Sequence, residues 1–216
     1  MPPLIAFDFD GTLADTGRDL ATALNKTLAQ NNLPAASDAD VLQWVGYGVL
    51  RLLERALAHC GRDISMAAQL YNAFLQNYRD CFLDTTALYP GVLDCLRQLA
   101  SGHSMVIISN KPEKLLRPLV SGLGLDIFFK YVVGGDTAGV KKPDLRVWLH
   151  VCGRLNHKGP GAIVGDTPID MEFGRQAKLK TVACTWGFRA LPALKEARPD
   201  HLVSHPSQIP AIFQEP

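Results

Sequence analysis

Short apolar runs alternate with segments of helical periodicity along this chain, and that alternation restricts the possible folds most. The first run, residues 4–9, is apolar at nearly every position, as expected of a strand covered on both faces. Similar runs occur at 105–109, 131–133, 162–165, 181–184 and 201–203. Helical spacing separates most of them, at 91–100, 115–123, 145–155 and 169–177. Strands that alternate with helices predict an α/β fold with a doubly wound parallel sheet.

Residues 16 to 84 interrupt this alternation, because no strand is predicted there. Thr16 with Asp19 three positions later is typical of a helix start, and leucines follow at intervals of four. Further helical segments are expected at 49–58 and 67–83. We therefore predict a Rossmann-like α/β core domain of residues 1–15 and 85–216. An all-helical cap domain of residues 16–84 is inserted after the first strand.

The charge balance restricts the partners of the chain. Lysine and arginine number 22 against 21 acidic residues, so nothing in the net charge of +1 favours nucleic acid or an anionic membrane. Five cysteines without a C-x-x-C pair favour reduced thiols over a disulfide framework. The chain begins without a signal-like segment and has no apolar stretch of about 20 residues, so we expect a cytoplasmic protein. A monomer or small homo-oligomer is expected.

Polar side chains follow the predicted strands where each strand ends. Asp8 and Asp10 follow the first strand, and other strand ends are followed by Ser109-Asn110, by Lys142 and by Asp166 with Asp170. Taken singly, each has a structural explanation as a turn, a helix cap or a surface lysine. The carboxyl ends of parallel strands meet at one edge of the sheet. Carboxylates, a hydroxyl and an ammonium group gathered there suit a hard cation, a phosphate and a nucleophile.

These polar segments at the strand ends resemble, in order, the four motifs of the haloacid-dehalogenase-like phosphohydrolases. The matching segments are Asp8-Phe9-Asp10-Gly11-Thr12-Leu13, Ser109-Asn110, Lys142-Pro143 and Gly165-Asp166-x-x-x-Asp170. The helical insertion resembles the small helical cap of that family. Trp44-Val45-Gly46-Tyr47-Gly48 and Ser109-Asn110-Lys111-Pro112 are similar to segments of its bacterial phosphoglycolate phosphatases. Two positions depart from the pattern: Asp144 replaces a frequent proline, and Lys178 stands where a glycine usually ends the helix of the fourth motif.

The resemblance implies Mg²⁺-dependent hydrolysis of a phosphomonoester through an aspartyl-phosphate on Asp8. Asp10 would protonate the leaving alkoxide and then activate the attacking water. The metal site would comprise Asp8, Asp10 through its backbone carbonyl, and Asp166, with Asp170 holding waters or Lys142. Ser109 and Lys142 complete the catalytic set. The phosphate-binding residues would be Phe9, Gly11, Thr12, Ser109, Asn110 and Lys142, with Gly11 also turning the chain tightly.

The resemblance further implies a small phosphorylated metabolite with a second anion, such as 2-phosphoglycolate. The motif residues bind only phosphate, so the cap is expected to bind the second anion. The second anion could bind to the backbone amides of Gly46, Tyr47 and Gly48, which precede a helix. It could also bind to the guanidinium groups of Arg18, Arg51 and Arg55. Solvated helix faces or salt bridges within the cap remain the alternative for each arginine.

Other functions stay open on the sequence alone. A sugar phosphomutase shares all four motifs, and a phosphatase could act on a sugar phosphate or pyrophosphate instead. A dehalogenase would need neither Asp10 nor a metal, and a phosphonatase would need a lysine in the cap, where Lys26 is the one candidate. A non-catalytic binding module would be expected to have lost Asp8 or Asp166, and both are present.

Overall fold

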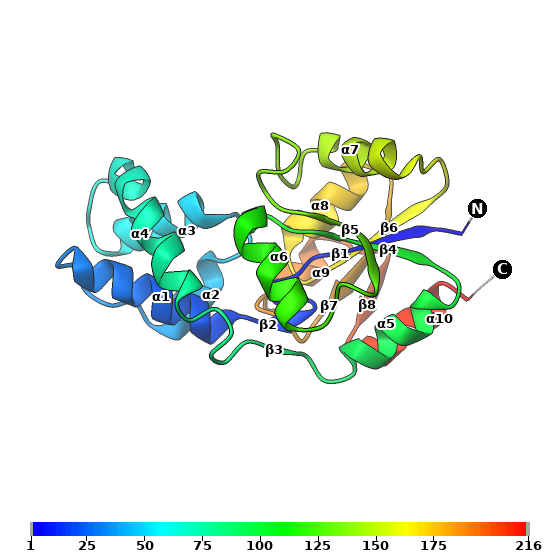
Figure 1. The fold of residues 1–216 in the computed structure, drawn as a ribbon, viewed down its shortest axis with the longest axis horizontal. Helices are drawn as coiled ribbons and strands as arrows, with labels where there is room; N and C mark the ends of the chain where they lie inside the picture. Colours follow the sequence, from blue (N-terminus) through cyan, green and yellow to red (C-terminus); the bar gives the residue numbers. More distant parts are fainter. Residues whose placement is uncertain (1, 215–216) are drawn as a thin grey trace.

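The core of the protein is a six-stranded parallel sheet in a computed structural model that describes residues 2–214 (Figure 1). The strand order is β5-β4-β1-β6-β7-β8, and each neighbouring pair runs parallel. The strands are β1 Leu4–Phe7, β4 Ser104–Ile108, β5 Phe129–Val133, β6 Gly161–Gly165, β7 Lys180–Cys184 and β8 His201–Val203. The predicted α/β fold with a parallel sheet is confirmed. Every run expected to be a strand of this sheet forms one.

Helices cover both faces of the sheet, which explains why the strands are apolar at consecutive positions. Ile5 and Phe7 of β1 pack on one face, against helices α5, α6 and α10. Leu4 and Ala6 pack on the other, against α7 and α8. The helices are α5 Val92–Ala100, α6 Glu113–Gly122, α7 Arg146–Leu155, α8 Pro168–Gln176, α9 Leu191–Glu196 and α10 Ile209–Ile212. None of the helices in the described part of the chain is both long and apolar enough to cross a membrane.

The first strand ends two residues earlier than predicted, and the reason bears on the site. Asp8 still donates its N–H to Val164 of β6. The chain then turns, because the Phe9 carbonyl accepts hydrogen bonds from the N–H groups of Thr12, Leu13 and Ala14. Asp10 therefore lies on a loop rather than on the strand, and its side chain need not point the same way as that of Asp8.

Four helices that follow the first strand of the sheet in sequence form a separate unit, at the left of Figure 1. They are α1 Gly17–Gln30, α2 Asp38–Trp44, α3 Val49–His59 and α4 Ala67–Arg79, with a single 3₁₀ turn before α4. All lie within residues 16–84, the range predicted for the cap, and no strand lies among them. The α4 helix ends at Arg79 rather than at residue 83, and α2 was not predicted.

A two-stranded ladder connects the parallel-sheet core to the helical unit. In it β2, Ala14–Asp15, pairs antiparallel with β3, Ala87–Leu88. Beside the ladder, the buried carboxylate of Asp19 accepts hydrogen bonds from the N–H and hydroxyl groups of both Thr85 and Thr86. The predicted helix start is confirmed, since α1 begins at Gly17. Thr16 and Asp19 do not cap it, however, because their side chains bind other partners.

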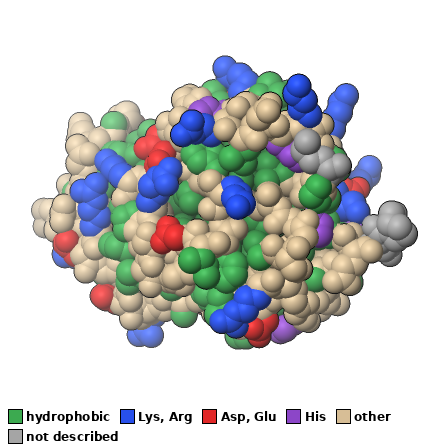
Figure 2. Space-filling view, turned by 45° about the vertical axis from the view of Figure 1, so that its right-hand side comes forward, with side chains coloured by type: hydrophobic (Ala, Val, Ile, Leu, Met, Phe, Trp, Pro, Cys, Tyr) green, Lys and Arg blue, Asp and Glu red, His purple; other side chains and the backbone are tan. Residues whose placement is uncertain are grey.

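Charged side chains are dispersed over the face of the molecule seen in Figure 2. Figure 2 shows lysine and arginine side chains at several separate places on the visible face, with acidic side chains between some of them. This distribution agrees with the formal net charge of +1.

Candidate active site

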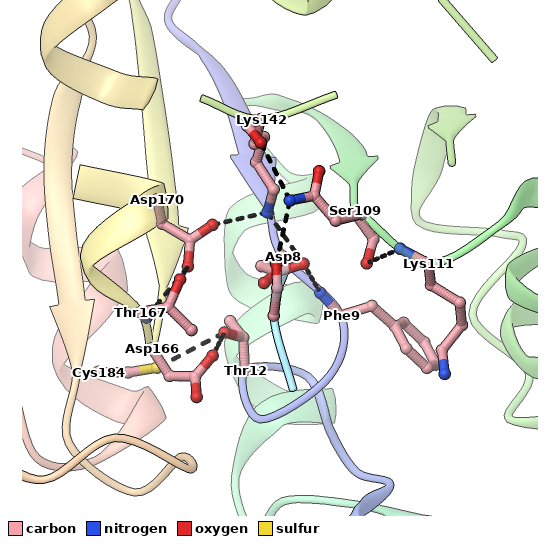
Figure 3. Close-up of polar contacts among 12 residues, drawn as sticks. Asp8, Phe9, Thr12, Ser109, Lys111, Lys142, Asp166, Thr167, Asp170 and Cys184 are labelled. Carbon is pink, nitrogen blue, oxygen red and sulfur yellow. Dashed lines mark hydrogen bonds and ion pairs between the residues drawn. The ribbon is translucent and has the colours of Figure 1, made fainter. Parts of the chain in front are cut away.

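Three adjacent strands bring the predicted motif residues together at one edge of the sheet. Asp8 follows β1, Ser109 follows β4 and Asp166 follows β6, and β1 lies between the other two. Lys142 comes from the loop after β5, and Asp170 from the first turn of α8. Figure 3 shows Lys142 pointing between Asp8 and Asp170. Four segments far apart in the sequence thus meet at the carboxyl ends of the strands, as predicted.

Lys142 is buried between two carboxylates. Its Nζ lies 3.0 Å from Asp8 Oδ1 and 2.6 Å from Asp170 Oδ1. The second oxygen of Asp170 accepts hydrogen bonds from the hydroxyl and N–H of Thr167, in a capping box that starts α8. Asp170 is therefore fixed by its own helix and holds Lys142, one of the two roles expected for it. Oδ1 of Asp8 also accepts a 2.7 Å hydrogen bond from the N–H of Phe9.

Asp166 is fully buried and is held by two donors. Thr12 donates its hydroxyl to Oδ1 at 3.0 Å, and Phe188 donates its N–H to Oδ2 at 2.8 Å. Gly11 packs directly on this carboxylate with a φ of +80°, and a Cβ there would lie 2.4 Å from Asp166 Oδ2. Only glycine fits this position, because a side chain would meet both a left-handed backbone and the carboxylate.

The three carboxylates of Asp8, Asp166 and Asp170 form one cluster, in which one oxygen from each lies within 4.8 Å of the others. Burial raises the pKa of Asp8 to about 7, and the negative charges of Asp170 and Asp10 add to this effect while Lys142 opposes it. Burial and the charges of Asp8 and Asp170 raise the pKa of Asp166 to about 8. Burial alone would lower the pKa of Lys142, but Asp170 and Asp8 raise it above its ordinary value.

The cluster fits a divalent cation. When all three carboxyl groups are ionised, they and the one ammonium group of Lys142 leave two negative charges in a buried space, and an uncompensated buried charge is costly. Oxygen ligands of this kind are those that Mg²⁺ prefers. The residues present therefore match the ion that the sequence motifs imply.

Asp10 is not part of this cluster and has partners of its own. Its Oδ1 accepts a 2.6 Å hydrogen bond from the hydroxyl of Thr16 and lies 3.0 Å from Nζ of Lys111. Lys111 in turn donates to the hydroxyl of Tyr78 on α4, at 2.9 Å. The carboxylate of Asp10 is thus separate from the other three, as a proton donor and acceptor would require. Lys111 and Tyr78 were not predicted as site residues, although Lys111 directly follows the Ser109-Asn110 motif.

The predicted phosphate-binding groups and the N–H of Asp10 divide into two sets. The N–H groups of Gly11 and Thr12 are used in the turn after Phe9, and the N–H of Phe9 is used by Asp8. Among residues 2–214, the N–H groups of Asp10 and Asn110 make no hydrogen bond. Together with the buried hydroxyl of Ser109 and the ammonium of Lys142, these two are the donors available to a phosphoryl group.

A pocket lies between the motif residues and the helical unit. Asp8, Asp10 and Ser109 line one side, and apolar side chains of the helical unit line the other. Gly46 and Gly48 reach the pocket, as expected of the segment before α3.

The three cap arginines predicted to bind substrate do not line this pocket. Arg18 is exposed on α1, and Arg51 is exposed and pairs with Glu54 at 2.7 Å. Arg55 lies 4.3 Å over the ring of Tyr47 and donates to backbone carbonyls at the end of α2. The arginines thus serve contacts within the helical unit or face outward.

Donors from the core bind backbone carbonyls of α2 and of the segment that joins α2 to α3. Arg189 donates to the carbonyls of Leu42 and Val45, and Asn110 donates to that of Gly46 at 3.0 Å. Lys141 donates to the carbonyl of Tyr47 at 2.8 Å. These three donors hold the helical unit over the pocket. Sequence reasoning missed Arg189 and Lys141, because no motif marks them.

Comparison with known proteins assigns the chain to a family. The model of the haloacid dehalogenase-like hydrolases matches residues 5–184. The phosphoglycolate phosphatase of Yersinia pestis is 35% identical over 213 residues, covering 96% of this chain and 92% of its own length. That of Pseudomonas syringae pv. syringae is 36% identical over 205 residues, covering 92% of this chain and 75% of its own length.

The crystal structure of a predicted phosphoglycolate phosphatase from Haemophilus somnus has the same architecture. Its TM-score is 0.91 at 28% sequence identity, and the superposition covers 99% of this chain and 98% of that one. The chain belongs to the haloacid dehalogenase-like hydrolase family. Within that family it groups with the phosphoric monoester hydrolases, as the sequence predicted.

Proposed function

We propose that this hydrolase is a Mg²⁺-dependent phosphatase that acts through an aspartyl-phosphate on a small metabolite of the 2-phosphoglycolate type. The observation that carries the proposal is the division of four buried or half-buried carboxylates into two groups. Asp8, Asp166 and Asp170 form one cluster, in which Lys142 binds Asp8 and Asp170, while Asp10 pairs separately with Lys111. One group suits a metal and a nucleophile, and the other suits proton transfer.

Asp8 and Asp166, with the backbone carbonyl of Asp10, would hold the ion. Asp170 contributes to the charge of the cluster, but both of its oxygens already accept hydrogen bonds. When bound, Mg²⁺ screens the charge between a carboxylate nucleophile and a phosphate. The donors of Ser109, Lys142 and the N–H groups of Asp10 and Asn110 orient the phosphoryl oxygens.

Asp8 is the proposed nucleophile because it directly follows the central strand β1 and belongs to the carboxylate cluster. Lys142 and the Phe9 N–H both bind Oδ1, which leaves the other oxygen to form a bond to phosphorus. As that bond forms, the ester oxygen leaves and takes a proton from Asp10. Asp10 then accepts a proton from the water that attacks the aspartyl-phosphate, and phosphate is released with Asp8 restored.

The substrate class rests on the named relatives and on the pocket. The relatives from Yersinia pestis and Pseudomonas syringae are phosphoglycolate phosphatases. The pocket is closed over by the apolar side chains Leu20, Val45, Val49, Leu52, Phe74 and Leu115. A sugar would bury several hydroxyl groups against this wall without partners, at a cost for each. A small leaving group is favoured over a sugar, and this argues against a sugar phosphomutase.

Phosphate release from a panel of phosphomonoesters, with Mg²⁺ and with EDTA, tests the proposal. We expect release only with Mg²⁺ and a kcat/KM for 2-phosphoglycolate at least roughly tenfold above that for ethyl phosphate, since one charge-paired contact is worth about 2–5 kcal/mol. Asp8→Asn should abolish turnover while keeping the far-UV spectrum and cooperative unfolding of the wild type. Turnover by Asp8→Asn, in a sample shown by mass to be free of deamidation, would exclude the mechanism.

A further inference from the structure

Lys111 is the one cationic side chain among the described residues that line the pocket. The other charged residues there are Asp8 and Asp10, and most of the remaining lining is apolar. Lys142 lies outside this lining, between Asp8 and Asp170, where the phosphoryl group is expected. Among the described residues that line the pocket, Lys111 is therefore the one cation available to bind a second anion of a substrate.

The position of Lys111 is fixed from both parts of the protein. Its side chain is 3% exposed, its Nζ lies 3.0 Å from Asp10 Oδ1, and it donates to the Tyr78 hydroxyl at 2.9 Å. The same Nζ lies 4.3 Å from the centre of the Tyr78 ring. An ammonium group has three donors, and the described residues occupy two of them. A buried ammonium with one open donor is suited to bind an anion that enters the pocket.

We propose that Lys111, a core residue, binds the carboxylate that a substrate carries next to its scissile ester. This inference rests on the proposed function, because it uses Asp10 as the group that reaches the ester oxygen. Lys111 adjoins Asp10, so an anion bound by Lys111 must lie within a few bonds of that ester oxygen. In 2-phosphoglycolate one carbon separates the ester oxygen from the carboxylate. The geometry thus selects short 2-phosphonooxy carboxylates rather than longer esters.

The test compares kcat/KM for 2-phosphoglycolate and ethyl phosphate in the wild type, in Lys111→Met and in a matched control, Lys114→Met. Lys114 is exposed on α6, three residues along the chain, and does not line the pocket. Lys111→Met should reduce kcat/KM for 2-phosphoglycolate roughly tenfold more than for ethyl phosphate, mainly through KM. Lys111→Arg should keep part of the preference, and Lys114→Met should keep all of it.

Equal losses on both esters in Lys111→Met would overturn the inference and leave Lys111 as a residue that only positions Asp10. A wild type that does not prefer 2-phosphoglycolate to ethyl phosphate would instead overturn the proposed substrate class. The two failures are thus distinguishable.

A second measurement needs no variant and covers the case in which Lys111→Met does not fold. The wild type is assayed with 3-phosphonooxypropanoate, which carries one more methylene between the ester oxygen and the carboxylate. Because Asp10 and Lys111 are adjacent, kcat/KM should fall roughly tenfold or more relative to 2-phosphoglycolate. Equal efficiency on the two esters would show that the carboxylate is bound elsewhere.

Discussion

Arg189, in the loop after β7, donates a 2.6 Å hydrogen bond to the backbone carbonyl of Leu42 on α2. It also donates to the carbonyl of Val45, and its side chain is largely buried between the two parts of the protein. Burial lowers the pKa of this guanidinium, while the charge of Asp166 opposes the effect. Because this buried cation binds backbone carbonyls at the end of α2, we infer that it holds the helical unit against the core.

Arg189→Met should weaken closure of the helical unit without removing any group that contacts phosphorus. Hydrogen bonds to charged groups contribute about 1.5–3 kcal/mol each, so kcat/KM should fall at least roughly tenfold. Hydrogen exchange of residues 42–48 should become faster in the same variant. The matched control is Arg154→Met, at an exposed position on α7. Unchanged exchange in Arg189→Met would show that other contacts hold the unit closed.

Asp10→Asn should separate proton transfer from nucleophilic attack. The amide keeps the shape of the side chain and can still accept the hydrogen bond from Thr16, but it cannot donate or accept the catalytic proton. We expect the first step to slow by about 10²–10⁴-fold with 2-phosphoglycolate, as is common for loss of an acid or base. With p-nitrophenyl phosphate the first step should slow much less, because that leaving group needs little protonation. Rapid-quench measurements that find equal losses would refute the acid role.

The stability of the metal-free protein should fall as the pH rises. Asp8 and Asp166 have pKa values raised from 3.8 to about 7 and about 8, so between these limits the folded state binds more protons than the unfolded state. The free energy of unfolding therefore decreases with pH across this window. Each ~1 kcal/mol lost lowers Tm by roughly 2–4 °C in a protein of this size. Thermal unfolding in EDTA from about pH 5 to pH 8 measures the effect.

Mg²⁺ should reverse that trend, because the ion competes with the protons for the same oxygens. The rise in Tm on adding Mg²⁺ should be larger at pH 8 than at pH 6. Asp166→Asn should reduce both the pH dependence in EDTA and the rise with Mg²⁺. A metal-induced rise of equal size in wild type and Asp166→Asn would place the ion elsewhere.

Lys178→Gly should stabilise the protein without altering turnover. Lys178 is exposed at the end of α8 with a φ of +54°, a conformation that costs a residue with a side chain about 1–2 kcal/mol. Glycine removes this cost, so Tm should rise by roughly 2–4 °C. Lys180→Gly, two residues later in β7, should lower Tm instead, because glycine weakens strands. A fall in Tm for Lys178→Gly would show that its side chain makes a compensating contact.

The sheet and the motif residues could be predicted because their signals are local. The strand β1 is apolar at consecutive positions, and Asp8 follows it directly. The ladder of β2 and β3 could not be predicted, because two-residue strands have no periodicity to detect. The roles of Lys111 and Arg189 were not predicted for another reason: their partners Tyr78 and Leu42 are 33 and 147 positions away in the chain. Such contacts appear only when the fold is known.

Ala14 in β2 lies directly opposite Leu88 in β3, so the helical unit leaves and rejoins the core at one place. Paired residues of an antiparallel ladder are only about 5 Å apart, a gap that a two-residue turn can span. One contiguous piece of gene therefore encodes the unit, and we expect that exchanging it for the unit of a relative leaves the strands before Asp8, Ser109 and Asp166 in register. A collection of such exchanges on this one core would be a direct way to obtain phosphatases with new selectivity.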